Sequence, residues 1–261
     1  MCLILFAYQA ESRFPLVVAA NRDELYSRPT RQADFWPEIH TGPEILAGRD
    51  LLAGGTWLGI TASGRFAAVT NIRDPSQPER KPRSRGELTL GFLQGSSDPA
   101  TYARQIQDSF DQYAGFNLLL GDGHSLYYLN NHHQVMTKLE SGVYGLSNGV
   151  LDAPWPKIVR GRSLLQQLVD NDNSVSTDDL LEIMRDRTEA ADGDLPNTGV
   201  SSELERKLSS TFIFQPERLY GTVCSTAIIV DKNRRCRFSE QNYNERGQPV
   251  AAHYYEFSLQ G

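Results

Sequence analysis

Short apolar runs separated by turn-forming residues dominate the chain, and this pattern predicts strands. Residues 3–8 and 16–20 are apolar and flank a polar turn at 9–13, which predicts a hairpin. The second run passes directly into a polar tetrapeptide at 21–24, so we expect this strand to deliver polar side chains to an edge or mouth of a sheet. Residues 28–54 are rich in Pro, Gly and Asp and are expected to form a loop.

A longer series of strands and helices is expected after this loop. Residues 56–60 and 66–71 flank a turn that contains Gly64, which predicts a second hairpin. Further strands are expected at 116–121, 125–129, 135–139, 143–146, 227–230, 237–241 and 254–257. Helices are expected at 87–94, from Asp98-Pro99 to about Tyr113, from Pro156, and after Ser176, where Asp179 is placed as in a capping box.

The order of these elements predicts the fold class. Four strands, two helices, four strands, two helices and three strands follow one another, with an excursion expected at 193–210. Strands joined by hairpins form antiparallel sheets, and paired helices must cover outer faces. We therefore expect an α+β fold, a four-layer αββα sandwich of two antiparallel sheets, as a single domain over residues 1–261. The sequence has no GxGxxG or GxxxxGK[ST] phosphate loop.

Charge and composition exclude several classes of protein. The 32 acidic residues against 26 basic ones give a net charge of −6, which argues against a nucleic-acid binder. No apolar run approaches the roughly 20 residues of a membrane span, and no signal peptide is expected. Three cysteines without framework spacing, Cys2, Cys224 and Cys236, favour a reduced, cytoplasmic setting.

Cys2 is the first candidate for chemistry. It follows the initiator Met1, and its side chain is small enough for that Met to be removed. Removal would leave a thiol and an α-amine on one residue, a nucleophile together with a base whose ordinary pKa is about 7.7–8.0. The alternative is that Cys2 is a small apolar residue at the start of a strand.

The polar tetrapeptide bears on this choice. If the first two strands pair as a hairpin, Asp23 lies near the α-amine of Cys2 and can hold it by a charge-assisted hydrogen bond. Arg22 could lower the pKa of the thiol or bind an anionic ligand, and Asn21 belongs to the same ligand-binding group. The alternative is a polar strand end with a surface Arg–Asp pair.

Short motifs in a fixed order run through essentially the whole chain. They include Met1-Cys2, Ala19-Ala20-Asn21-Arg22-Asp23-Glu24, Tyr26-Ser27-Arg28-Pro29, Gly54-Gly55-Thr56-Trp57-Leu58-Gly59-Ile60, Gly115-Phe116-Asn117-Leu118, Tyr144-Gly145-Leu146-Ser147-Asn148, Pro154-Trp155-Pro156-Lys157 and Tyr220-Gly221-Thr222. In this order they resemble the NRDE family, the family of transport and Golgi organisation protein 2. That family is similar to the N-terminal-nucleophile (Ntn) hydrolase fold.

The resemblance implies a set of site residues. Cysteine Ntn amidases, such as bile-salt hydrolases and penicillin V acylases, have an Asp at the end of the second strand and two Asn near the oxyanion. By resemblance these are Asp23, Asn71 and Asn148, with Cys2 as the nucleophile. Many family members have an Arg after the Tyr-Gly-Thr motif, where this chain has Val223, so a function that depends on that Arg would be absent.

The resemblance also implies a second function, that of a non-catalytic carrier. The family is associated with haem trafficking and with lipids or acyl-CoA, so the expected partner is a small amphipathic anion, and haem would be a transported ligand rather than a required cofactor. The residues expected to bind its anionic groups form the basic loop Arg80, Lys81, Arg83 and Arg85. No metal site is expected. The sequence thus leaves two functions open, a Cys2-dependent amidohydrolase and a carrier.

Overall fold

The computed structural model describes residues 2–36, 44–77, 81–171 and 175–260. It divides the chain into two compact units, and each unit is built from separated stretches of sequence. The first unit comprises Met1–Ser27 and Ser141–Glu256, and the second comprises Arg28–Glu140 and Phe257–Gly261. The expectation of a single domain over the whole chain stays a prediction.

The first unit contains a mixed-length sheet in the order β10-β1-β2-β12-β13-β14, with β11 paired to β12. The registered pairs are antiparallel. Its strands are β1 (Cys2–Glu11), β2 (Phe14–Leu25), β10 (Gly142–Leu146), β11 (Phe214–Gln215), β12 (Tyr220–Val230), β13 (Arg235–Tyr243) and β14 (Pro249–Ser258). The long strand β2 lies between β1 and β12 and is therefore paired on both sides.

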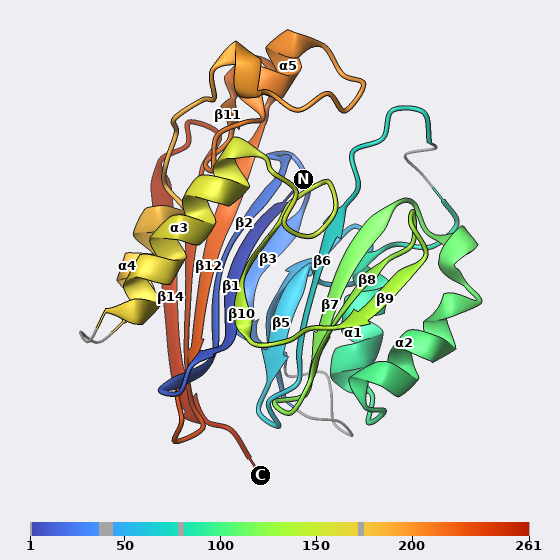
Figure 1. The fold of residues 1–261 in the computed structure, drawn as a ribbon, viewed down its shortest axis with the longest axis vertical. Helices are drawn as coiled ribbons and strands as arrows, with labels where there is room; N and C mark the ends of the chain where they lie inside the picture. The colour runs from blue at the N-terminus through green and yellow to red at the C-terminus, as the bar shows by residue number, and fades with distance from the viewer. Residues whose placement is uncertain (1, 37–43, 78–80, 172–174, 261) are drawn as a thin grey trace. The chain divides into compact units, whose positions relative to one another are not determined.

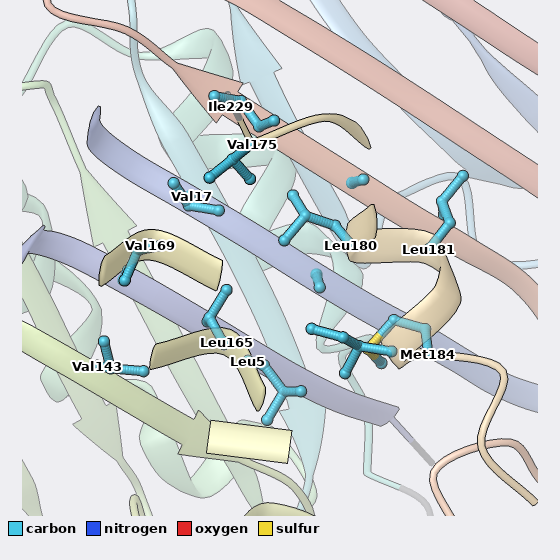
Figure 2. Close-up of a cluster of buried hydrophobic side chains, with 14 of the residues drawn as sticks. Leu5, Val17, Val143, Leu165, Val169, Val175, Leu180, Leu181, Met184 and Ile229 are labelled. Atoms are coloured by element: carbon cyan, nitrogen blue, oxygen red, sulfur yellow. The ribbon is translucent and has the colours of Figure 1, made fainter. Parts of the chain in front are cut away.

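Helices α3 (Pro156–Asp170) and α4 (Thr177–Ile183) lie on one face of this sheet (Figure 1). Alternate residues of the strands, such as Leu5 and Val17, point toward the helices and meet Leu165 and Leu180 in a buried apolar cluster (Figure 2). Both helix starts match the sequence prediction. Pro156 is the first residue of α3, and Ser176 and Asp179 form the capping box of α4. A short helix, α5 (Ser202–Lys207), follows.

The second unit contains a sheet in the order β3-β4-β5-β6-β7-β8-β9, also antiparallel in its registered pairs. Its strands are β3 (Thr30–Phe35), β4 (Ile45–Asp50), β5 (Leu58–Thr61), β6 (Phe66–Asn71), β7 (Phe116–Gly121), β8 (Leu126–Asn130) and β9 (Val135–Lys138). Helices α1 (Gly86–Gln94) and α2 (Pro99–Gln107) contribute Phe92 and Ala103 to a second core with Leu118 of the sheet.

The predicted fold class is confirmed, because both sheets are antiparallel and each unit contributes helices that pack on its sheet. Gly64 has the positive φ expected of the second hairpin, at 84°. None of the described helices is long and apolar enough to cross a membrane.

The prediction of a loop over residues 28–54 is wrong, because β3 and β4 lie within this stretch. Pro29 precedes β3 and Asp50 ends β4, but Asp34 and Gly48 lie within the strands, and the strand residues Ala33, Leu46 and Ala47 are buried. One helix boundary also differs from the prediction. The helix expected to reach Tyr113 ends at Gln107 and is followed by a 3-10 turn at Phe110–Gln112.

The polar tetrapeptide at 21–24 does not follow the strand but lies inside it. Asn21 pairs with Leu3 of β1 and with Ser225 of β12, so its backbone groups belong to the sheet ladders. A central strand with partners on both sides continues as long as both partners do, whatever the polarity of its side chains.

Arg65 holds the C-terminal end of α1 in the second unit. Its side chain is 9% exposed, and its Nε and Nη2 atoms donate to the Phe92 carbonyl at 3.0 and 2.9 Å. Nη2 also donates to the Ser97 carbonyl at 2.8 Å, and the guanidinium lies 3.9 Å from the centroid of the Phe92 ring. One side chain thus joins the Phe92 carbonyl in the last turn of α1 to the Ser97 carbonyl in the segment that follows.

We expect Arg65→Leu to lower the free energy of unfolding by about 2–3 kcal/mol, because buried carbonyls lose charged hydrogen-bond donors. Arg65→Lys should lose less, since an ammonium keeps the charge but not the fork geometry. Urea denaturation measures both. The control is Arg104→Leu on α2, where the exposed arginine donates only to the Thr101 hydroxyl, and we expect a change within about 0.5 kcal/mol. Equal losses at Arg65 and Arg104 would contradict the role of Arg65.

Candidate functional site

A row of side chains crosses the sheet of the first unit at the start of β1. Cys2 is opposite Arg22 of β2, Arg22 is opposite Cys224 of β12, and Cys224 is opposite Asn242 of β13. Directly paired residues point to the same face of a sheet. Since the neighbouring residue Leu3 points into the helix-covered core, this row lies on the face turned away from α3 and α4.

The Cys2 thiol is partly exposed and has charged neighbours of both signs. Burial raises the pKa of the thiol above its ordinary value, and the carboxylate of Asp23 acts in the same direction. The guanidinium of Arg22 and a hydrogen bond from the backbone N–H of Asp23 act in the opposite direction. The net effect is a thiol that stays protonated at neutral pH and needs a base to become a nucleophile.

Asp23 is buried, at 1% exposure, and its carboxylate is oriented by Thr222. The backbone N–H of Ile213 donates to Thr222 Oγ1 at 2.9 Å, and that hydroxyl is 2.8 Å from Asp23 Oδ1. Because the hydroxyl oxygen accepts from Ile213, its own proton points to the carboxylate. Thr222 was not among the predicted site residues, although the Tyr220-Gly221-Thr222 motif contains it.

Val223 occupies an irregular position in β12. Thr222 pairs with Asp23 and Cys224 pairs with Arg22, so two residues of β12 that are two apart oppose adjacent residues of β2. Val223 is therefore the extra residue of a β-bulge. The bulge keeps both Thr222 and Cys224 facing their β2 partners.

Asn21 has a structural use in the first unit. Its Nδ2 donates to the Met184 carbonyl at 2.8 Å and to the Thr211 carbonyl at 2.9 Å. Its Oδ1 accepts from Ser225 Oγ at 2.6 Å. Both amide hydrogens thus hold the segment after α4 to the sheet, and the side chain is 1% exposed.

Asn148 follows β10 by two residues, and β10 pairs with β1. The last registered pair is Ile4 with Leu146, so Ser147 and Asn148 lie just beyond the ladder. Ser147 Oγ lies 3.0 Å from the Cys2 carbonyl oxygen and 3.3 Å from Asn148 Oδ1. Ser147 and Asn148 are both buried, so this strand end is held against the start of β1.

The other predicted site residues belong to the second unit. Asn71 is the last residue of β6 and lines a pocket together with Arg85. Arg83 pairs with Glu87 at 2.9 Å and lies over the Tyr113 ring. Lys81 is exposed, and Arg80 lies outside the described residues. The role of the basic loop in binding an anionic ligand stays a prediction.

A buried polar network precedes Asn71 and was not predicted. Asn117 Nδ2 donates to Thr70 Oγ1 at 3.0 Å, and Asn117 Oδ1 accepts from Tyr128 and Asn130, both at 2.8 Å. All four side chains are buried. The network fixes the end of β6 immediately before Asn71.

Two further observations bear on the possible chemistry. One concerns the Cys224 thiol, and the other concerns metal binding. Burial raises the pKa of Cys224 well above its ordinary value, and Glu240 acts in the same direction, so Cys224 is a poor nucleophile compared with Cys2. Within the described ranges, no group of three or more His, Cys, Asp or Glu residues is arranged to hold a metal ion.

Comparisons with known proteins place these observations in a family. Among solved structures, a variant of conjugated bile acid hydrolase from Clostridium perfringens has a TM-score of 0.53 at 11% identity, covering 99% of this chain and 98% of that one. A Caenorhabditis elegans N-acylethanolamine-hydrolyzing acid amidase ortholog has a TM-score of 0.50 at 10% identity, covering 88% and 92%. These likenesses show a shared Ntn-hydrolase fold.

The sequence comparisons are more specific. The Transport and Golgi organization 2 homolog of Mus musculus is 33% identical over 279 residues, which cover 100% of both chains. The family model for Transport and Golgi organisation 2 matches residues 1–245. The resemblance identified from the sequence motifs is thereby confirmed, and the chain belongs to the Transport and Golgi organisation 2 family.

Proposed function

We propose that the first unit carries an Ntn-type amidohydrolase site in which Cys2 attacks an amide or thioester carbonyl. The observation that supports this proposal is the pairing of Cys2 with Arg22 in the β1–β2 ladder, together with the hydrogen bond from the Asp23 backbone N–H to the thiol. The two solved structures of similar fold are a conjugated bile acid hydrolase and an N-acylethanolamine-hydrolyzing acid amidase, which supports the same reaction class.

The base in this proposal is the α-amine of Cys2 after Met1 has been removed. The thiol has a raised pKa and holds its proton at neutral pH, so a base must take it. An α-amine with an ordinary pKa of about 7.7–8.0 is suited to this, and it is attached to the same residue. The buried carboxylate of Asp23, held by Thr222, would orient the resulting ammonium group.

The reaction balances without a further reagent. The amine takes the thiol proton as sulfur bonds to the carbonyl carbon, and the carbonyl electrons move to oxygen. Collapse of this intermediate breaks the C–N or C–S bond, and the ammonium proton passes to the leaving group. Water then attacks the acyl-thioester, which releases the acid and restores the thiol.

In this proposal, side-chain amides stabilise the oxyanion. Asn148, two residues after the end of β10, is the candidate donor of the first unit, and the same role for Asn71 stays a prediction. Removal of one such donor typically lowers kcat by about 10²–10³-fold. Arg22 adds a positive charge beside the thiolate that forms.

We expect the natively expressed chain to begin at Cys2, because a free α-amine is the proposed base. Intact-mass measurement decides this directly. Full retention of Met1 would block the amine and remove the proposed mechanism, and the same protein should then also fail to react in the probe experiment below.

We expect Cys2→Ala to lower acylation by a reactive thioester or amide probe at least about 10³-fold, because the nucleophile is lost. Cys224→Ala is the matched control, since it removes a buried thiol from the same row and should keep the labelling. Labelling that follows Cys224, or that survives Cys2→Ala, would contradict the proposal. Tight binding of haem or acyl-CoA without Cys2-dependent turnover would instead support the carrier function.

The pKa of the Cys2 thiol should respond with opposite signs to its two charged neighbours. Asp23 raises this pKa, so Asp23→Asn should shift the pH midpoint of iodoacetamide alkylation downward. Arg22 lowers the pKa, so Arg22→Gln should shift the midpoint upward. Alkylation rates of single-thiol proteins with Cys224 and Cys236 replaced give both midpoints. Shifts of the same sign in both variants would refute the described arrangement of charges.

A further inference from the structure

The second unit contains a pocket of about 280 Å³ beside the end of β6. Its wall includes Asn71, Arg73, Asp74, Arg85 and His132. These residues come from three separate parts of the sequence, namely the end of β6 with the loop that follows it, the start of α1 and the turn between β8 and β9. The candidate nucleophile is not part of this pocket.

The charges that line the pocket are unequal. Arg73 and Arg85 are permanently positive, whereas Asp74 supplies one carboxylate. Hydrogen bonds from the side chain and backbone of Ser76 lower the pKa of Asp74, so the carboxylate is ionised. Asp74 Oδ1 accepts from Ser76 Oγ at 2.6 Å, and Oδ2 lies 3.5 Å from His132 Nε2. Among the described residues that line the pocket, two guanidinium groups therefore outnumber the single carboxylate, and that carboxylate already contacts Ser76 and His132.

The wall of the pocket is held by backbone contacts. Arg85 Nη1 donates to the Gly115 carbonyl at 3.1 Å, and the backbone N–H of Ile72 donates to the same oxygen at 2.9 Å. A Cβ on Gly115 would lie 3.1 Å from Ile72 Cβ, so a glycine permits this close approach. The guanidinium of Arg85 is thus anchored at one nitrogen, which limits its motion at the rim of the pocket.

We propose that this pocket binds the oxyanion group of a small ligand, a phosphate or a carboxylate, through Arg73 and Arg85. Guanidinium groups present planar donor forks that match both anions, and two of them line one concave space of a size that holds such a group. Anion binding here is independent of any reaction at Cys2.

Binding of inorganic phosphate and of glutarate to the full chain, at constant ionic strength with chloride as the reference anion, tests the proposal. Calorimetry gives the dissociation constants, and amide NMR shifts report where the anion binds. In the wild-type protein we expect saturable shifts of the Ile72 and Gly115 amides. We expect Arg73→Gln and Arg85→Gln each to weaken binding about tenfold, since each removes one charged donor.

The matched control is the double variant Arg104→Gln/Lys138→Gln, which removes two exposed positive charges from the same unit. It should bind within about twofold of wild type, whereas Arg73→Gln/Arg85→Gln should lose binding. Tighter phosphate binding identifies a phosphate ligand, and tighter glutarate binding identifies a carboxylate. Equal weakening in both double variants, or no saturable shift at Ile72 and Gly115, overturns the proposal.

If the Arg73→Gln/Arg85→Gln variant fails to fold, the amide NMR shifts of the wild-type protein still show whether the anion binds at this pocket. Neither measurement involves turnover. Failure of anion binding would therefore leave the Cys2 proposal standing, and failure of the Cys2→Ala experiment would leave the anion site standing.

Discussion

The pairing of β2 on both sides is the constraint on which the candidate site depends. Because β1 and β12 flank it, the polar residues Asn21, Arg22 and Asp23 are all within the sheet and at most 5% exposed. Burial of polar and charged groups is unfavourable unless each is partnered. Asn21 forms hydrogen bonds with two backbone carbonyls and a serine hydroxyl, and Asp23 accepts a hydrogen bond from Thr222. The central position of β2 in the sheet therefore requires the hydrogen bonds that Asn21 and Asp23 form.

Strand alternation then divides these residues between two tasks. Asn21 is on the helix side, where it ties the segment after α4 to the sheet, and Arg22 is on the opposite side in the row with Cys2. The bulge at Val223 interrupts the alternation on β12 and lets Thr222 reach Asp23 while Cys224 stays beside Arg22. The same three consecutive residues of β2 thus support the fold and shape the environment of the thiol.

The sequence predicted most strands because their apolar runs are local signals. Residues 3–8, 66–71 and 116–121 coincide closely with observed strands, and the caps of α2 and α4 follow from Asp98 and Ser176. The short strands β3 and β4 were missed because Pro, Gly and Asp residues break up the apolar runs between residues 28 and 54. Thr222 and the network around Asn117 were missed for another reason. Their partners Asp23 and Thr70 are far away in sequence, so no local pattern identifies them.

The structure also bears on the family Arg that this chain replaces with Val223. That position is the extra residue of the bulge, between Thr222, which contacts Asp23, and Cys224, which is opposite Arg22. Arg22 interacts electrostatically with the thiols of both Cys2 and Cys224 and favours the charged form of each. A positive charge is therefore already present in the Cys2 row without a contribution from position 223.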